Sequence, residues 1–309
     1  MADVLYVNDD FSNDRILNGS VCCFGVFDGV HAGHRYLVER TVKDAKRCGS
    51  RSAIITFDID PDELFHAASL KKLMSNKARI EMLASLPVDD VIVLAFTQAF
   101  ASRTPEEFLE ACFGAATPTA LHVGSNFRFG SHATGDVEAL WVWGQSHGMR
   151  VEGHDLETML DKPVSSTRIR ELLSDGRRIK DANELLTRPY RMMGKVEVGR
   201  QEGRDMGFRT ANVYIDPQLR ALSPGVFAAY AFVDGIRYKA AVSVGVSPMF
   251  ADETKAYCEA HLLDFDRDIY GNEISLDFIH WLRPMMKFDS VDALIATVMG
   301  NIQWVRDNL

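Results

Sequence analysis

The chain has 309 residues, of which 47% are hydrophobic and 25% are charged, and its formal net charge at pH 7 is −9. This composition is ordinary for a globular protein, and the length suggests about two domains. The negative net charge argues against nucleic-acid binding over a broad surface, because that function needs an extended basic face.

The cysteines and the apolar runs indicate the compartment in which the protein works. The five cysteines include no C-x-x-C pair, which favours buried reduced thiols over disulfides or a zinc site. The first ten residues are acidic and lack the apolar segment of a secretion signal. No apolar run approaches the roughly 18 residues of a membrane helix. We therefore expect a cytoplasmic protein without a membrane partner.

The first half of the chain alternates between apolar strands and amphipathic helices. After a short edge element before Ser20, the pattern predicts strands at 22–27, 52–57, 91–96, 120–123 and 149–154, and helices after His34, at 77–86, from Pro105 and at 137–146. The strands are apolar throughout instead of alternating with polar residues. This favours a parallel sheet that is covered by helices on both faces.

The stretch from Phe24 to His34, FGVFDGVHAGH, is the most informative part of this half. It reads as a buried strand, a turn punctuated by glycines and the start of a helix. His31 and His34 are three residues apart and share one face of the first helical turn, where free N–H groups and the helix dipole already favour anions. Two surface histidines on an ordinary turn are the alternative, but the strand before and the helix after them favour a phosphate site.

Three loops of this half each follow a strand. They are the His31/His34 turn, residues 58–61 and residues 124–130. Because ligands bind a parallel sheet beyond the carboxyl ends of its strands, we expect all three loops on one rim.

Residues 162–175 come near the end of this half. Ser165, Ser166 and Thr167 form an N-cap cluster ahead of a helix that contains Arg168 and Arg170. One interpretation is that the hydroxyls and one arginine bind a triphosphate. The other is a well-capped helix whose arginines are solvated.

The character of the sequence changes near residues 181–188, so we expect domains at 1–186 and 187–309. Short β-rich segments at 191–198, 226–233, 237–244, 256–262 and 273–281 are strand candidates. Asp234-Gly235 is a strong hairpin signal, and Tyr270-Gly271-Asn272 is another turn. Residues 291–305 read as an amphipathic helix. An antiparallel barrel-like domain with a C-terminal helix fits this order.

Eight motifs occur in one order across both halves. They are FGVFDGVHAGH, TFDIDP (Thr56 to Pro61), VGSNFRFG (Val123 to Gly130), VSSTRIR (Val164 to Arg170), GKVEVGRQEGRDMGFRTAN (Gly194 to Asn212), SPGVFAAY (Ser223 to Tyr230), EAHLLDF (Glu259 to Phe265) and DIYG (Asp268 to Gly271). On these motifs the chain resembles the bifunctional prokaryotic riboflavin kinase/FMN adenylyltransferases, also called FAD synthetases, over nearly its whole length.

The resemblance implies an α/β, Rossmann-like nucleotidyltransferase domain followed by an antiparallel β-barrel kinase domain with a C-terminal helix. The barrel would phosphorylate riboflavin with ATP to give FMN. The first domain would transfer AMP from a second ATP to FMN, giving FAD and pyrophosphate. The implied partners are the small molecules riboflavin, FMN and ATP, with Mg²⁺ as cofactor, no nucleic acid and at most weak self-association.

The resemblance also implies roles for particular residues. In the first domain, ATP would be bound by Gly25, Phe27, Asp28, Gly29, His31, His34, Ser166, Thr167 and Arg170, with the two histidines as catalytic groups; the flavin would be bound by Asn126, Phe127 and Phe129. The two Phe rings at strand spacing are as often part of a core. In the kinase half, Gly199, Gly203 and Gly207 would cover the nucleotide, Thr210 and Asn212 would hold Mg²⁺ and phosphates, and Glu259 would be the general base. An exposed strand glutamate that faces water is the alternative for Glu259.

The chain departs from the family pattern at four positions. Arg209 replaces a proline, Asp60 replaces a histidine, Ser243 replaces an asparagine and Met249 replaces a threonine. An anion at Asp60 would repel phosphate unless a metal or an arginine intervenes. The kinase-side changes leave two other readings open, an adenylyltransferase with a weakened kinase and a flavin- or nucleotide-sensing protein without turnover. Glu259 argues against the second of these, because a pure binder needs no base.

Overall fold

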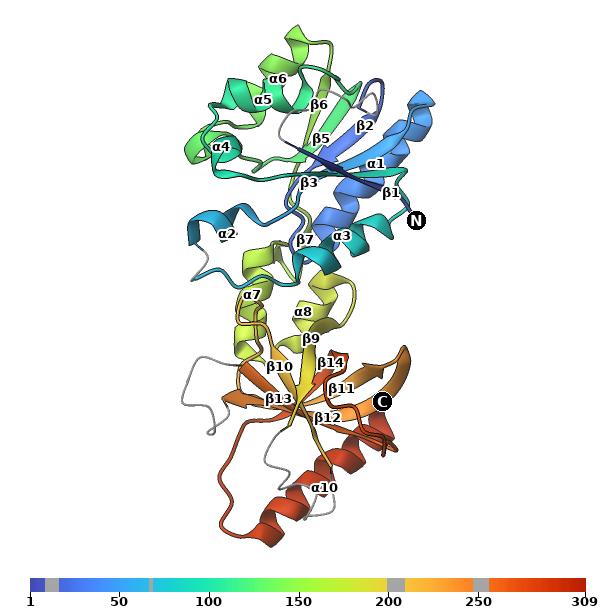
Figure 1. Cartoon of the computed structure of the whole chain (residues 1–309), viewed down its shortest axis with the longest axis vertical. Helices are drawn as coiled ribbons and strands as arrows, with labels where there is room; N and C mark the ends of the chain where they lie inside the picture. Colours follow the sequence, from blue (N-terminus) through green and yellow to red (C-terminus); the bar gives the residue numbers. More distant parts are fainter. Residues whose placement is uncertain (9–16, 67–68, 199–208, 247–255) are drawn as a thin grey trace. The chain divides into compact units, whose positions relative to one another are not determined.

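The computed structural model describes residues 1–8, 17–66, 69–198, 209–246 and 256–309, apart from the side chains of 246, 256 and 257 (Figure 1). Contacts divide the chain into two compact units. The first unit is residues 1–70 with 75–165, and the second is residues 71–74 with 166–309.

The first unit is built on a six-stranded parallel sheet with the order β1-β4-β3-β2-β5-β6. The strands are β1 (Asp3–Val7), β2 (Val21–Phe24), β3 (Ser52–Phe57), β4 (Asp90–Leu94), β5 (Ala120–Gly124) and β6 (Arg150–His154). Every residue of β2, β3 and β4 is buried, which explains why these segments are apolar throughout. The expected parallel sheet and its short edge strand are therefore confirmed.

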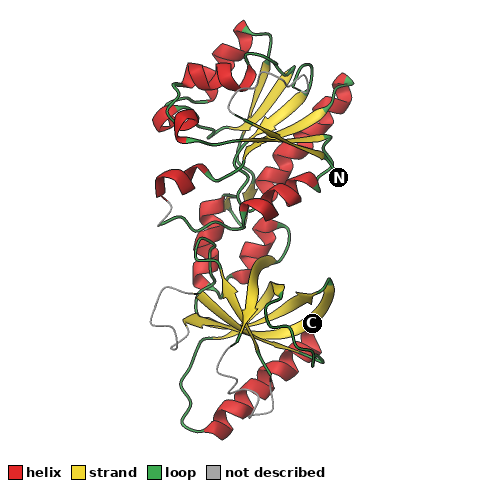
Figure 2. Cartoon of the chain, viewed as in Figure 1, coloured by secondary structure: helices red, strands yellow, loops and turns green. Residues whose placement is uncertain are grey.

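Helices cover both faces of this sheet (Figure 2). The described part of this unit contains α1 (Ala32–Cys48), α2 (Pro61–His66), α3 (Asn76–Ala84), α4 (Gln98–Ala101), α5 (Pro105–Phe113) and α6 (Val137–Ser146). It also contains a 3₁₀ turn at Ser131–Ala133 and a small hairpin of β7 (Thr158–Met159) and β8 (Lys162–Pro163). Thr104 and Glu107 form a capping box at the start of α5, and Pro105 occupies its first turn. Local sequence therefore sets where α5 begins.

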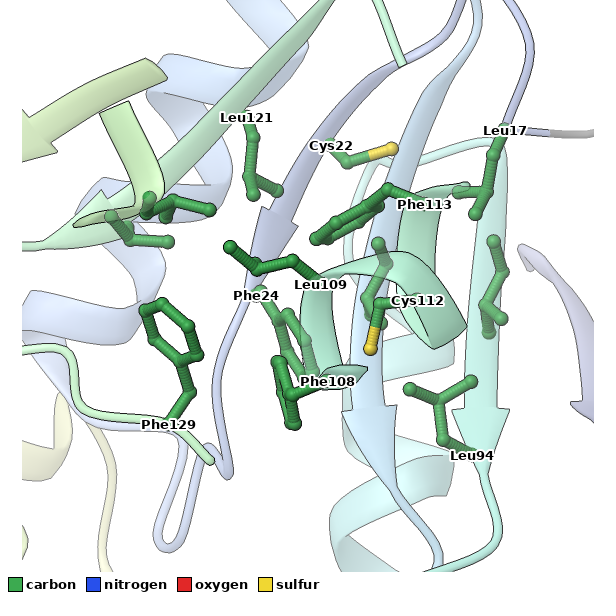
Figure 3. Packing of buried hydrophobic residues seen from close by; sticks show 14 of the residues in the cluster. Leu17, Cys22, Phe24, Leu94, Phe108, Leu109, Cys112, Phe113, Leu121 and Phe129 are labelled. Carbon is green, nitrogen blue, oxygen red and sulfur yellow. The ribbon is translucent and has the colours of Figure 1, made fainter. Parts of the chain in front are cut away.

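Adjacent residues of β2 are buried in different hydrophobic clusters. Cys22 and Phe24 pack in a large cluster with side chains of α5 and α6 (Figure 3). Val21 instead packs against Ala45 of α1. Because side chains alternate across a strand, this arrangement places α1 on one face and α5 with α6 on the other.

A buried polar network joins α1 to β5 and β6. Asp44 accepts hydrogen bonds from Arg47 (2.6 Å), from Arg150 and from His122 Nε2 (3.1 Å). The other ring nitrogen of His122 lies 2.8 Å from His154 Nε2. Burial would raise the pKa of Asp44, but these hydrogen bonds outweigh burial and lower the pKa to about 2. Asp44 is therefore ionised and fully paired at neutral pH.

The second unit contains a closed antiparallel barrel with the order β10-β13-β12-β11-β14-β9. The strands are β9 (Tyr190–Glu197), β10 (Ala211–Ile215), β11 (Gly225–Val233), β12 (Ile236–Val246), β13 (Ala256–Leu262) and β14 (Glu273–Arg283). The expected hairpin at Asp234-Gly235 is present, since Val233 pairs with Ile236 and both turn residues have positive φ, 51° and 77°. Of these barrel strands, only β10 is absent from the strand candidates that the sequence offers.

Among the residues that the structure describes, three helices accompany the barrel: α7 (Ser166–Asp175), α8 (Ile179–Leu186) and the C-terminal α10 (Val291–Asn308). Ile179, Ala182 and Leu185 of α8 have no exposed surface. Asn183 donates from its side chain to Phe278 O of β14 at 2.8 Å and accepts from Tyr190 N at 2.7 Å. By contacts α7 and α8 thus group with the barrel, whereas the sequence places the boundary after residue 186. Which division gives stable pieces remains a prediction.

Candidate active sites

The turn between β2 and α1 has an unusual backbone. Strand β2 ends at Phe24, three residues before the predicted end, because the backbone turns away after Gly25. Phe27, Gly29 and Val30 have φ values of 61°, 81° and 41°. Positive φ is unfavourable for Phe and especially for a β-branched valine, and such strain concentrates at functional sites. The turn is therefore a site candidate on its backbone alone.

His31 and His34 lie together at the start of α1. His31 is the N-cap residue, and its Nδ1 accepts the backbone N–H of His34 at 3.4 Å. The two rings are stacked with centroids 3.6 Å apart and planes 15° apart. Because Nδ1 accepts, a neutral His31 ring carries its proton on Nε2. Two imidazoles at a helix N-terminus form a donor set that suits a phosphate.

The Phe27 side chain packs against the pair formed by His31 and His34. Its ring is 1% exposed and meets the His34 ring edge-on, with centroids 5.2 Å apart. A Cβ at Gly25 would come within 3.3 Å of the Phe27 ring, so a larger residue at Gly25 would push on it. The structure thus gives Phe27 a packing role beneath the histidines, and Asp28, next to it, is 5% exposed.

The loop after β3 lies on the same rim. Asp58 Oδ1 accepts the backbone N–H groups of Ile59 (2.9 Å) and Phe96 (2.8 Å), which joins the ends of β3 and β4. Asp60 is 8% exposed and accepts Asp62 N at 3.0 Å in the first turn of α2. Asp60 therefore has a structural task that an aspartate performs well.

Sequence reasoning misses Arg79 of α3, which joins two of these loops. Its guanidinium is 1% exposed and donates to Val26 O, before α1, and to Thr56 Oγ1 and Phe57 O, at the end of β3. The available signal is its position, because Arg79 lies four residues before Leu83, and both side chains are buried on the same face of α3.

The flavin-side candidates after β5 occupy different environments. Asn126 is exposed, and Phe127 is half-buried. Phe129 is 4% exposed and lies in the large core cluster, 5.2 Å from the Phe108 ring between centroids (Figure 3). Of the three, Asn126 and Phe127 have surface available to a ligand, whereas Phe129 packs the core.

The remaining nucleotide candidates of the first half belong to the second unit by contacts. Ser166 and Thr167 form the first turn of α7, half-buried and exposed respectively. Arg170 Nε donates to Lys71 O at 2.8 Å, so part of its guanidinium holds the segment 71–74.

In the barrel, the kinase candidates gather on neighbouring strands. Asn212 of β10 is the direct register partner of Glu259 of β13, and Glu259 is in turn the partner of Ser243 of β12. Directly opposed residues of antiparallel strands share a face, so these three side chains form one row. Asn212 is 5% exposed, whereas Glu259 is exposed. The structure thus brings together an amide and a carboxylate that lie far apart in the sequence.

A pocket of about 290 Å³ has Asn212 of this row in its lining. All of its lining residues belong to the second unit. Its lining includes Thr210, Asn212, Asp266 and Asp268. These side chains offer hydroxyl, amide and carboxylate oxygens, the donors that Mg²⁺ prefers. Gly199, Gly203, Gly207 and Met249 lie outside the described residues.

The comparisons with known proteins follow the same two-part division. A family model described as FAD synthetase matches residues 13–168, and one described as riboflavin kinase matches residues 186–309. Bifunctional riboflavin kinase/FMN adenylyltransferases are similar over nearly the whole chain: that of Listeria monocytogenes is 30% identical, covering 98% of this chain and 96% of its own, and that of Pseudomonas fluorescens is 31% identical, covering 93% and 92%.

The chain belongs to the bifunctional riboflavin kinase/FMN adenylyltransferase family.

A solved structure from Streptococcus pneumoniae, described as a macrolide-efflux protein, shares the fold with a TM-score of 0.86 and 27% identity over the full length of both chains. That description applies to the Streptococcus protein. In the parts of this chain that the structure describes, no helix is both long and apolar enough to cross a membrane.

Two departures of this family member have visible contacts. Arg209, in place of the family proline, offers its backbone carbonyl to His261 Nδ1 at 2.8 Å and reaches Asp266 O at 3.4 Å. Ser243, in place of an asparagine, contacts Met285 Sδ at 3.4 Å. Arg209 therefore ties the segment before β10 to the pocket wall, and Ser243 stands directly beside Glu259.

Proposed function

We propose that this chain makes FAD in two steps, ATP-dependent phosphorylation of riboflavin in the barrel and adenylylation of FMN on the parallel-sheet unit. The observation that carries the proposal is the full-length similarity to enzymes named for both reactions, together with one family model for each reaction, matched to residues 13–168 and 186–309. The riboflavin kinase and FMN adenylyltransferase activities, with ATP as substrate and FMN and FAD as products, follow from family membership.

Adenylyl transfer needs positioning more than a protein nucleophile. A phosphate oxygen of FMN attacks the α-phosphorus of ATP, a new P–O bond forms, and pyrophosphate leaves with the electrons of the broken bond. His31 and His34, at the N-terminus of α1, would donate hydrogen bonds to phosphate oxygens as negative charge redistributes. Asn126 and Phe127 would contact the flavin, and Ser166, Thr167 and Arg170 would contact the triphosphate.

Riboflavin phosphorylation needs a base for the 5′-hydroxyl. Glu259 would accept that proton as the oxygen attacks the γ-phosphorus and ADP leaves. The Glu259 carboxylate is exposed, so a substrate could contact it at its place on β13. Glu259 is the register partner of Asn212, so the proposed base and the proposed phosphate ligand would stand on adjacent strands.

Mg²⁺ is the proposed metal of the kinase site. Thr210 and Asn212 would hold it together with ATP phosphates, and Asp266 and Asp268 are further oxygen donors of the same pocket. When bound, the metal supplies charge neutralisation on the transferred phosphoryl group. Among the described residues, no cluster of three or more His, Cys, Asp or Glu side chains could hold a metal ion.

The surroundings proposed for this enzyme are those of a reduced cytoplasm. Cys22, Cys23, Cys112 and Cys258 are free and buried, and burial raises the pKa of each of these thiols well above its ordinary value, which makes them inert. No nucleic-acid or membrane partner is proposed.

The deciding experiment is chromatography of flavins after incubation with riboflavin, ATP and Mg²⁺. Formation of FMN and then FAD supports both steps. FAD from supplied FMN alone indicates a weakened kinase, and unchanged bound flavin indicates a sensor.

A His31→Ala variant separates the two sites. We expect FAD formation to fall about 10²–10³-fold, because one donor to the developing charge is lost. Riboflavin phosphorylation should stay near that of the unaltered enzyme, because Glu259 belongs to the other unit. His147→Ala, which removes a ring stacked on Trp143 of the outer helix α6, is the control and should retain both activities. Equal loss of both activities in folded His31→Ala would refute the assignment of the two sites.

A further inference from the structure

The side chain of Arg79 is the largest that the first unit buries almost completely, at 1% exposure. Nη1 donates to Val26 O (2.8 Å) and Thr56 Oγ1 (2.7 Å), and Nη2 donates to Phe57 O (2.7 Å) and Asp58 O (3.4 Å). All four acceptors are neutral oxygens. Burying a cation costs free energy unless nearby anions offset its charge. The role of Arg79 therefore depends on the acidic residues near it.

The four hydrogen bonds of the guanidinium end on neutral oxygens, while the negative charges of four carboxylates act on it through space. Burial lowers the pKa of Arg79, whereas the negative charges of Asp60, Asp28, Glu63 and Asp58 raise it. Asp28 and Asp60 belong to the two loops that Arg79 joins, and both are buried. The rim on which His31 and His34 lie thus carries four acids, although its proposed substrates, ATP and FMN, are anions.

We propose that Arg79 is a positioning residue for adenylyl transfer, because it fixes the loop before α1 to the end of β3 and neutralises the rim carboxylates so that phosphates can bind. The inference rests on the proposed adenylyltransferase function. It also accounts for Asp60, which stands where the family carries a histidine: the buried arginine supplies the positive charge at this rim.

The geometry separates two contributions of Arg79. The span from Val26 O to Phe57 O uses both Nη atoms, and a lysine ammonium, a single nitrogen, cannot reproduce it. The charge, by contrast, survives in a lysine. A methionine removes both the span and the charge and keeps most of the volume.

The test measures steady-state FMN adenylylation by Arg79→Met, Arg79→Lys and Asp60→Asn, with varied ATP and FMN. We expect Arg79→Met to lower kcat/KM about 10²-fold, since the loop carrying the histidines loses its anchor. Arg79→Lys should restore KM for both anionic substrates while kcat stays low. Asp60→Asn, which keeps the oxygen that caps α2, should lower KM for ATP about two- to tenfold in the otherwise unaltered chain.

A double variant distinguishes an electrostatic role from a merely structural one. Adding Asp60→Asn to Arg79→Met should recover about tenfold in kcat/KM, because one of the negative charges that Arg79 offsets is gone. If the double variant is worse than either single variant, the neutralising role is wrong. If Arg79→Met does not fold, Arg79→Lys decides the question through kcat and Asp60→Asn through KM for ATP. A normal kcat in Arg79→Lys together with an unchanged KM for ATP in Asp60→Asn overturns the proposal.

A matched control lies at the opposite end of β3, the strand whose carboxyl end Arg79 contacts. Arg51, before β3, makes two hydrogen bonds to Asp90 of β4, 2.9 and 2.6 Å long. Arg51→Met removes an arginine that joins neighbouring strands but lies away from the rim, so its KM values should be unchanged. If the unaltered chain makes no FAD, the proposed function fails; if it makes FAD and Arg79→Met matches Arg51→Met, only this inference fails.

Discussion

Asn212 and Glu259 are direct register partners across the antiparallel strands β10 and β13. They are 47 positions apart (259 − 212) in a chain whose motifs alone give no sign of this pairing. Because both stand on well-formed strands of one closed barrel, the distance between their Cα atoms is fixed by the sheet. The proposed kinase site therefore stands on a rigid element.

The first prediction concerns this pair. Glu259→Gln keeps the size of the side chain but cannot accept a proton, so FMN formation should fall roughly 10²–10⁴-fold while riboflavin binding changes little. Kinase kinetics and flavin fluorescence titration measure the two quantities. Ser243→Ala, at the neighbouring register position, is the control and should stay within a few-fold of the unaltered enzyme. Near-normal phosphorylation by Glu259→Gln would leave Asp266, which lines the pocket, as the next candidate base.

Asp264, also close in sequence, is less suited to that role. Its carboxylate makes two hydrogen bonds to Arg306 of α10, 2.9 and 3.1 Å long, and these hold its pKa below the ordinary range. A carboxylate engaged in this way is a poor proton acceptor.

The second prediction concerns pH and Asp44. The folded-state pKa of about 2 lies below the ordinary value of 3.8, so the stabilisation is complete above about pH 4 and is lost as the pH falls towards 2. Asp44→Asn should therefore lower the free energy of unfolding at pH 7 by about 2 kcal/mol, and the difference from the unaltered chain should shrink below pH 4. Denaturant unfolding at several pH values measures this.

The exposed pair of Asp264 and Arg306 provides the comparison. The Asp264 side chain is 72% exposed, so solvent screens the pair and Asp264→Asn should change stability far less than Asp44→Asn. Equal effects of the two substitutions would contradict the importance of the buried network.

The third prediction uses two glycines with open space around them. Neither Gly235 nor Gly300 has an atom within 4 Å of an added Cβ, so only the backbone distinguishes them. Gly235 has a φ of 77° in the hairpin turn, and Gly235→Ala should destabilise the barrel by about 1–2 kcal/mol. Gly300 lies inside α10, and Gly300→Ala should stabilise it by about 0.5–1 kcal/mol. Thermal unfolding should show shifts of opposite sign.

The fourth prediction concerns the domain boundary. A fragment of residues 166–309 should fold more stably than one of residues 187–309, because the shorter piece loses the buried face of α8 and both hydrogen bonds of Asn183. Circular dichroism on heating compares them. Equal melting temperatures would favour the boundary after residue 186. A cut near Ala182, by contrast, would divide α8 itself.

The sequence predicts regular elements best where composition and period agree. The bounds of β3, α6 and β13 match the predicted ranges, and the parallel order follows from uninterrupted apolar strands. Strand β10 is missed because it is five residues long and contains an asparagine, which strands disfavour.

Parts of the candidate sites escape prediction for another reason. Arg79 donates to backbone carbonyls of residues 21 or more positions away. Every residue has a backbone carbonyl, so the sequence does not show which of them a side chain will contact. Phe129 shows the converse, since a motif residue turns out to lie in the core. Sequence patterns report local period and chemistry, whereas both of these facts depend on which loops the tertiary fold brings together.

The order of strands in the barrel has a consequence for synthesis of the chain. Its first strand, β9, pairs with its last, β14, through Tyr190 and Phe278 among others. Until the ribosome has released β14, β9 and β11 each present an unsatisfied edge, and such edges template aggregation. Non-local pairing of this kind also slows folding. A nascent chain that stalls before Glu273 therefore carries two strand edges with unpaired backbone groups. Chaperone protection should matter most between the synthesis of β11 and that of β14.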